Sequence, residues 1–497
     1  MLSTLVLATL ASLHSALPAP AQATAVAAGA AGVADVTGTW KGSVQVPGQS
    51  DPDAFVLTLE PRADGKLEGR FRSTLGNADF RADWDAGERA LAFACDFGSG
   101  TAVDFALTLE GEELAGSPGA PLVAGLRAKR ASREAVAQPP IEVDLSRPRP
   151  VSVDLGGLPD FWEEPIVALV DATLAAEAIV GLSMAIAADG ELLDVRSFGW
   201  QDYHGNEPAS GRTMYRWASI GKSVTATLAL QLVEEGKLDL ERDVREYVPE
   251  FPAKQFPFSA RQLLCHQAGI VHYQHGPVRT ERTYERENPF ADRILALDMF
   301  KESPLLFEPD TSYSYSTHGY VLLGAVVERA GGAPFDEQLA ERIAKPLGLE
   351  TFQPDHPTTE IPERTLGYCV RADGSAVLGG DSNVSWKVPG GGYISTVAEL
   401  ARYGAAFCDE GLLSAESRRA MWTEQRTKDG TGHGYGFGFG VGELEGRRVV
   451  SHSGGQRKTS TFLIVCPDLK LVVALMCNTQ GAGLGDLARA ILAEMIG

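Results

Sequence analysis

The stretch Trp217-Ala218-Ser219-Ile220-Gly221-Lys222-Ser223 opens a segment whose apolar residues recur at helical spacing until Gly236 closes it. Ser219 and Lys222 stand three residues apart, so a helix would place both side chains on one face, one turn apart. A serine hydroxyl is a poor nucleophile until a base takes its proton, and a lysine with a lowered pKa can take it. A capping serine beside a solvated lysine is the ordinary alternative for this spacing.

Two later segments contain side chains suited to the same chemistry. Tyr315 lies 96 residues after Ser219, directly before a helical pattern, where its phenol can point into a cleft and relay protons beside a lysine. His452, Gly454 and Gly455 enter an apolar strand, where the glycines let the backbone approach a ligand closely. Read alone, the tyrosine is explained by packing and the histidine by a turn before a strand.

In this order, the three segments resemble the active-site motifs of the serine β-lactamase and penicillin-binding protein superfamily, and most closely those of its class C branch. The resemblance covers roughly residues 160–497. It implies that Ser219 is the nucleophile, that Lys222 and Tyr315 handle its proton, and that His452 belongs to the third motif. A narrower likeness, in 247–252, 264–273 and 315–320, is to the mitochondrial serine β-lactamase-like branch.

The same resemblance implies which groups meet the substrate. The backbone N–H groups of Ser219 and Gly455 would form the oxyanion hole, where one donor is worth about 3–4 kcal/mol of barrier. Thr317 stands where most members have asparagine, and its hydroxyl is too short to donate and accept as a carboxamide does. This disfavours efficient β-lactam hydrolysis and favours a peptide or ester. Gly454 and Trp386 are expected to line the substrate pocket.

The rest of the chain predicts two folded units. Apolar and polar residues alternate over residues 37–128, which predicts a small antiparallel barrel or sandwich, either a binding module or a structural appendage. Prolines mark residues 129–158 as an extended linker. In 159–497, helical and strand patterns mix, with Asp189-Gly190 as a hairpin turn and strands near both ends. This indicates an α+β domain with an antiparallel sheet flanked by helices.

The first residues read as a targeting segment. Residues 1–23 contain an apolar run that ends in Ala21-Gln22-Ala23, as in a secretory signal peptide, and a loose leader follows over 24–36. No Lys or Arg precedes the run, so a short membrane anchor is the alternative. We therefore expect a secreted or periplasmic protein, without a stable membrane span in the later sequence.

Composition and cysteine usage limit the possible partners. The 497 residues carry 44 Lys+Arg against 65 Asp+Glu, and this net charge of −21 argues against a nucleic-acid partner. The six cysteines form no CxxC pair, which disfavours a disulfide scaffold or a cysteine zinc site. The Gly-aromatic alternation of 432–440 lacks the Gly-Lys-Ser/Thr of a phosphate loop and predicts a strand with aromatics on one face.

These observations predict a serine hydrolase that needs no metal or cofactor. It would act through an acyl-enzyme on a small molecule or peptide: a peptide, ester, D-amino-acid amide or β-lactam. A non-catalytic peptidoglycan-binding or scaffold protein on the same fold is the second hypothesis. A metallohydrolase using His266, His272 and His275 is the third, although their spacing suits no usual zinc pattern. The sequence leaves the oligomeric state open.

Overall fold

The computed structural model describes residues 35–45, 53–62, 66–73, 76–95, 103–118, 125–132, 142–273, 293–356, 359–371, 374–379, 383–409 and 411–497. The expected signal peptide, residues 1–23, and nearly all of the expected leader lie outside these ranges. Among the described helices, none combines the length and apolar character needed to cross a membrane.

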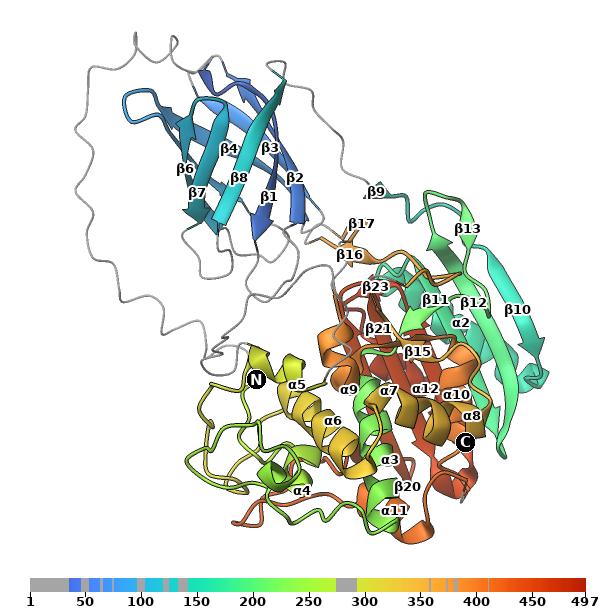
Figure 1. Cartoon of the computed structure of the whole chain (residues 1–497). Helices are drawn as coiled ribbons and strands as arrows, with labels where there is room; N and C mark the ends of the chain where they lie inside the picture. The colour runs from blue at the N-terminus through green and yellow to red at the C-terminus, as the bar shows by residue number, and fades with distance from the viewer. Residues whose placement is uncertain are drawn as a thin grey trace.

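The N-terminal unit is a closed antiparallel barrel, in which each strand pairs with the next and the last with the first (Figure 1). Side chains alternate between the interior and solvent, as on β5, so the rings of Phe71, Phe93 and Phe105 stack inside. The predicted period of two is confirmed, in its barrel form. The strands are β1 (Gly38–Gln45), β2 (Asp53–Pro61), β3 (Leu67–Ser73), β4 (Gly76–Asp85), β5 (Ala90–Cys95), β6 (Val103–Glu110), β7 (Glu113–Pro118) and β8 (Gly125–Ser132).

The C-terminal unit is built on one antiparallel sheet in the order β10-β12-β11-β22-β21-β20-β19. Its centre pairs β11 with β22, so strands from the two ends of the domain lie side by side. The predicted α+β class is therefore confirmed. The strands are β10 (Val151–Gly156), β11 (Gly181–Ala188), β12 (Glu191–Asp202), β19 (Gly440–Leu444), β20 (Arg447–Gln456), β21 (Thr459–Cys466) and β22 (Leu471–Cys477), and β13 (Glu207–Pro208) pairs with β12.

The hairpin turn between β11 and β12 has the predicted position. Asp189 and Gly190 both have positive φ, 53° and 88°, which is the geometry that a two-residue antiparallel turn requires.

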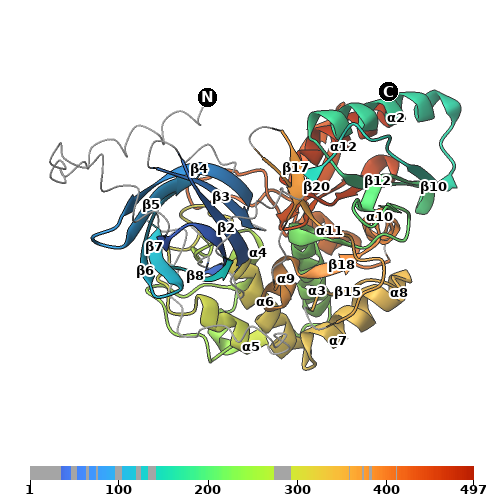
Figure 2. The ribbon, with the colours of Figure 1, turned by 90° about the horizontal axis from the view of Figure 1, so that it is seen from above.

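Helices cover both faces of this sheet. On one face α2 (Asp160–Ala176) and α12 (Leu484–Ile496) share an apolar core with β11, β21 and β22, and they lie next to each other in Figure 2. On the other face α10 (Val397–Ala405) packs against β11 and β22. Beyond it, α3 (Gly221–Glu234), α6 (Thr317–Gly331) and α9 (Val388–Gly391) contact one another. The turn that leads into α3 and the segment that precedes α6 both contribute residues to the site described below.

Shorter elements connect these layers. They are η2 (Ala218–Ile220), η3 (Val244–Glu246), α4 (Ala260–Leu264), α5 (Arg293–Ala296), η4 (Leu297–Met299), α7 (Phe335–Leu339), η5 (Ala340–Ala344), α8 (Lys345–Leu347), η6 (Ser385–Lys387), α11 (Ala415–Met421) and η7 (Pro467–Leu469), with short strands β9 (Glu142–Val143), β14 (Tyr215–Arg216), β15 (Gln353–Pro354), β16 (Tyr368–Val370), β17 (Ala376–Leu378), β18 (Tyr393–Ser395) and β23 (Thr479–Gln480).

The expected linker, 129–158, differs from the structure at both ends. The last barrel strand continues to Ser132, while β9 pairs with β17 and β10 pairs with β12 at the edge of the large sheet. Pro148 and Pro150 come just before β10, and an edge position tolerates proline because no second neighbour needs the missing N–H. Proline content alone therefore does not distinguish a linker from an edge strand.

The predicted aromatic strand over 432–440 is wrong. The chain turns at Gly434 and Gly438, which have positive φ of 64° and 77°, and β19 begins only at Gly440. Tyr435, Phe437 and Phe439 are all buried, so the alternation reflects turns that bring aromatic rings into the core instead of a pleated surface.

Candidate active site

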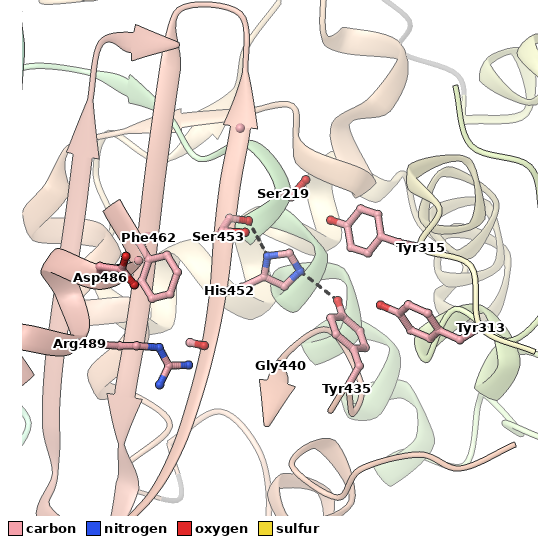
Figure 3. Close-up of a pocket in the computed structure, with 13 residues that line it drawn as sticks. Ser219, Tyr313, Tyr315, Tyr435, Gly440, His452, Ser453, Phe462, Asp486 and Arg489 are labelled. Carbon is pink, nitrogen blue, oxygen red and sulfur yellow. Dashed lines mark hydrogen bonds between the residues drawn. The ribbon is translucent and has the colours of Figure 1, made fainter. Parts of the chain in front are cut away.

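Ser219 lies in η2, a single tight turn that leads directly into α3. The residue before it, Ala218, has a left-handed φ of 48°, which is uncommon for a residue with a side chain and is typical of sites held by their surroundings. The predicted helix is confirmed apart from this first turn. Figure 3 shows the Ser219 hydroxyl pointing toward the phenol of Tyr315 and into a pocket beside β20.

Lys222 is fully buried one turn after Ser219. Its Nζ donates to Ser219 Oγ at 3.1 Å and to the Gly390 carbonyl at 2.8 Å, and it lies 4.8 Å from the centre of the Tyr315 ring. Burial lowers the pKa of this amine well below its usual value of 10.5, and the positive charge of Lys387 lowers it further. The arrangement presents an amine ready to accept a proton.

Tyr315 lies two residues before α6, on the opposite side of Ser219 from β20 (Figure 3). Its phenol faces the Ser219 hydroxyl (Figure 3), and burial raises the pKa of the phenol above its usual value of 10. Since the pKa of Lys222 is lowered and that of Tyr315 is raised, the lysine is the better proton acceptor of the two. The phenol remains a donor.

His452 lies on β20 with both ring nitrogens engaged, as the dashed lines of Figure 3 mark. Nδ1 lies 2.6 Å from the Ser453 carbonyl, which can only accept, so Nδ1 carries the proton and Nε2 accepts from the Tyr435 hydroxyl at 3.0 Å. Burial, followed by the charge of Lys222, lowers the pKa of His452 to about 3. The imidazole is therefore neutral, and its ring centre is 6.2 Å from that of Tyr315.

Tyr435 and Tyr313 are site residues that the sequence reasoning missed. Tyr435 reaches the pocket because it stands between the turning glycines Gly434 and Gly438. The signal was present in the Gly-aromatic alternation, but a strand with aromatics on one face predicted packing and not a pocket wall.

The pocket itself has a volume of about 550 Å³. Gly455 lines the pocket from β20. The pairing of β20 with β19 ends at Ser451, so Gly455 lies beyond the paired part of the strand. At its far end α12 contributes Asp486 and Arg489 (Figure 3). The lining residues are Ser219, Tyr313, Tyr315, Tyr435, Gly440, Ser451, His452, Ser453, Gly455, Phe462, Gly485, Asp486 and Arg489.

Three residues expected at the substrate lie outside this lining. Thr317 begins α6 and is buried, with its methyl group facing Gly390. Trp386 lies in η6 and packs near the ring of Tyr273. Gly454 faces the Trp217 carbonyl on the neighbouring turn. The structure thus brings Ser219, Lys222, Tyr315, His452 and Gly455 together and places Thr317, Trp386 and Gly454 behind them.

Gly454 has a packing role that leads to a prediction. A Cβ at this position would lie 2.4 Å from the Trp217 carbonyl oxygen and 2.1 Å from Thr461 Oγ1, so alanine would push β20 away from the turn that contains Ser219. We expect Gly454→Ala to lower the free energy of unfolding by about 1–3 kcal/mol and to reduce kcat. Gly442, where nothing lies within 4 Å of an added Cβ, is the matched control. Thermal unfolding and turnover of both variants test this, and equal kcat values would contradict it.

The histidines proposed as metal ligands serve another purpose. Nδ1 of His266 and of His272 each accepts a backbone N–H, and His275 lies outside the described residues. Within the described part of the chain, no three His, Cys, Asp or Glu side chains form a group suited to a metal ion.

The fold and this group of side chains define a class of protein. The model of the Beta-lactamase family matches residues 166–494, and the chain belongs to this family of β-lactamase- and penicillin-binding-protein-like serine hydrolases. The resemblance inferred from the three motifs is therefore confirmed.

Particular relatives are of several kinds. The human "Serine beta-lactamase-like protein LACTB, mitochondrial" is 26% identical over 63% of this chain and 76% of its own length. "Penicillin-binding protein 4" of Amycolatopsis lactamdurans is 27% identical over 68% of this chain and 90% of its own. Among solved structures, a D-stereospecific amidohydrolase from Streptomyces sp. is 25% identical with a TM-score of 0.54, covering 66% of this chain and 97% of that one.

Proposed function

We propose that this protein is a class C-like serine hydrolase that works through an acyl-enzyme on Ser219. One observation carries the proposal: a buried amine with a lowered pKa and a half-buried phenol with a raised pKa face a single oxygen (Figure 3). Lys222 Nζ lies 3.1 Å from Ser219 Oγ, and the Tyr315 phenol faces the same hydroxyl (Figure 3). A nucleophile needs a base on one side, and its leaving group needs an acid on the other.

In the acylation step, Ser219 Oγ forms a bond to the substrate carbonyl carbon while its proton passes to Lys222 Nζ. The carbonyl oxygen becomes an oxyanion held by the backbone N–H groups of Ser219 and Gly455. When this intermediate collapses, the bond to the leaving group breaks, and the leaving atom takes a proton from the Tyr315 phenol. Tyr315 recovers a proton from the Lys222 ammonium, so the amine is neutral again.

In the deacylation step, water attacks the ester carbon and gives a proton to Lys222 through Tyr315. The ester bond to Ser219 Oγ breaks, and Oγ regains its proton. His452 stays neutral throughout, holding the Ser453 carbonyl with Nδ1 and the Tyr435 hydroxyl with Nε2. It thereby keeps the strand edge and the phenol wall of the pocket in place.

The far end of the pocket indicates what part of a substrate it meets. Arg489 is half-buried there, and no carboxylate in the described part of the chain pairs with it. A guanidinium in this position suits a carboxylate on the substrate. Relatives named as a penicillin-binding protein and a D-stereospecific amidohydrolase fit this reading. We therefore favour peptides or D-amino-acid amides with a free carboxylate, met outside the cytoplasm.

This substrate preference gives a second prediction. Arg489→Gln is expected to raise KM about tenfold or more for a substrate with a free carboxylate, since a hydrogen bond to a charged group is worth about 1.5–3 kcal/mol. The same substrate as its methyl ester should show no change, and Arg489→Lys should lie between the two. Steady-state kinetics on the ester and acid pair measures this. An equal loss on both substrates would contradict carboxylate recognition.

Intact-mass spectrometry of the acylated protein tests the proposed function itself. Intact-mass spectra of the protein are recorded with a fluorophosphonate, a penicillin, an aryl ester and a D-amino-acid amide, and the modified peptide is then sequenced. We expect one adduct, on Ser219, and release of the acyl group for at least one substrate class. Labelling at another residue would contradict the proposal, and an adduct that never releases with any class would favour the binding-protein hypothesis.

A further inference from the structure

We propose that His266 and His272 are positioning residues that together fix Tyr315 for proton transfer, an inference that rests on the proposed function of Tyr315. Neither imidazole lines the pocket. Both lie on the segment that follows α4, and both reach the beginning of α6, directly after the tyrosine.

The first argument is a pair of matching hydrogen bonds. The backbone N–H of Ser316 donates to His266 Nδ1 at 3.1 Å, and the next one, from Thr317, donates to His272 Nδ1 at 3.1 Å. The first N–H groups of a helix have no partner within the helix, so an outside acceptor must satisfy them. Here the N–H groups of the two residues directly after Tyr315 each donate to an imidazole nitrogen.

The second argument is that the chain is tied on both sides of Tyr315. Before it, the N–H of Ser314 donates to the His266 carbonyl at 3.0 Å. After it, the Ser316 hydroxyl donates to the Val271 carbonyl at 2.8 Å, in addition to the two imidazole contacts. The backbone that flanks the tyrosine is thus held by one short segment, 266–272, from both directions.

The third argument concerns the ring of His266. It lies 4.4 Å from the ring of Tyr315, 4.9 Å from that of Tyr435 and 5.2 Å from that of Tyr320, centre to centre. Its contact with Tyr315 limits the movement of the phenol directly. His266 also holds a left-handed φ of 61°, so the backbone is strained where the side chain turns toward the tyrosine.

The fourth argument is that His266 is a poor residue for stability alone. Since Nδ1 accepts a hydrogen bond, the neutral ring carries its proton on Nε2, and this buried nitrogen has no hydrogen-bond partner among the described residues. Leaving a buried donor unpaired is unfavourable. Burial, followed by the nearby amine of Lys222, lowers the pKa of His266 well below 6.5, which keeps Nδ1 an acceptor at neutral pH.

The test uses two variants of each histidine that differ in which nitrogen they replace. Asparagine places its amide oxygen near the position of Nδ1 and tolerates the left-handed φ of His266. Glutamine extends its amide toward the position of Nε2 and leaves the backbone N–H without an acceptor. We expect His266→Gln to lower kcat by about 10–100-fold with KM within twofold, because small misplacements of a reacting group are costly. His266→Asn should recover most of that loss.

His272→Gln and His272→Asn repeat the comparison at a less buried site, which keeps the test valid if His266 variants fail to fold. The rate of Ser219 acylation, followed by intact mass, is measured beside kcat and KM. Equal activity of the Asn and Gln variants at both positions would overturn the inference, as would a change confined to KM. If the unaltered protein does not acylate Ser219 at all, the proposed function fails instead, so the two failures are distinguishable.

Discussion

Replacing Ser219 by alanine is expected to abolish acylation and to lower kcat by about 10⁴-fold or more, as loss of the nucleophile does in other serine hydrolases. The oxygen that alanine lacks accepts a hydrogen bond from Lys222 at 3.1 Å and is the one that the Tyr315 phenol faces (Figure 3). Intact mass after incubation with a fluorophosphonate should show no adduct. Turnover of any substrate found for the unaltered protein should fall to background.

Ser223→Ala is the matched control, since it removes a hydroxyl from the first turn of α3, four residues after Ser219. That hydroxyl donates to the Ile220 carbonyl, accepts from Tyr403 and does not line the pocket. We expect it to lower the free energy of unfolding while leaving the adduct on Ser219. Strong residual hydrolysis by the Ser219→Ala variant would remove the acyl-enzyme hypothesis.

Lys222→Met is expected to lower kcat by about 10²–10⁴-fold, the range typical of losing a general base, without loss of thermal stability. Methionine fills similar space, but its thioether has no proton to exchange with Ser219. Lys222 is fully buried, and among the described residues its amine donates hydrogen bonds only to a hydroxyl and a carbonyl. Burying the amine there requires it to lose its charge, which lowers the stability of the folded protein. Removing that cost should keep the melting temperature equal or raise it.

The stability gain of Lys222→Met should depend on pH in a defined direction. In the unfolded chain, lysine binds a proton up to its usual pKa of 10.5, whereas in the folded protein the pKa is lowered, so the unfolded state holds more protons at neutral pH. The lysine penalty is therefore larger at pH 7 than at pH 9.5, and it fades as the pH rises toward 10.5. Denaturant unfolding at pH 7 and pH 9.5 tests this. A gain that grows with pH would contradict a buried, neutralised amine.

The local part of the site could be predicted from the sequence because its geometry is local. A spacing of three residues at the beginning of a helix is sufficient to place Lys222 beside Ser219. The convergence of Tyr315 and His452 depended on the family resemblance, since no spacing rule joins segments so far apart in the sequence. Proline spacing failed at residues 151–156 for a related reason, because pairing with β12 depends on a neighbour that the local pattern does not contain.

The residues behind the site were harder to assign for a physical reason. Thr317 and Trp386 were expected at the substrate because of their place in a motif or loop, yet both are buried one layer deeper. The sequence indicates His266 and His272 only as metal ligands, because their spacing says nothing about which ring nitrogen faces a backbone N–H. The alternating pattern predicts a strand at Tyr435, because the positive φ of Gly434 and Gly438 cannot be read from it.

The turn that contains Ser219 packs closely against Gly454 and Gly391. This packing affects how the substrate range of the protein can evolve. The position of the reactive oxygen is set by main-chain packing. The carbonyl groups of Trp217 and Ala218 lie so close to the two glycines that an added Cβ would clash with them. The opposite end of the pocket is formed by side chains of α12, which do not pack against the turn that contains Ser219. Reactivity and substrate selectivity thus depend on different elements of the fold. Substitutions in α12 are expected to change which acyl groups are accepted without lowering the reactivity of Ser219.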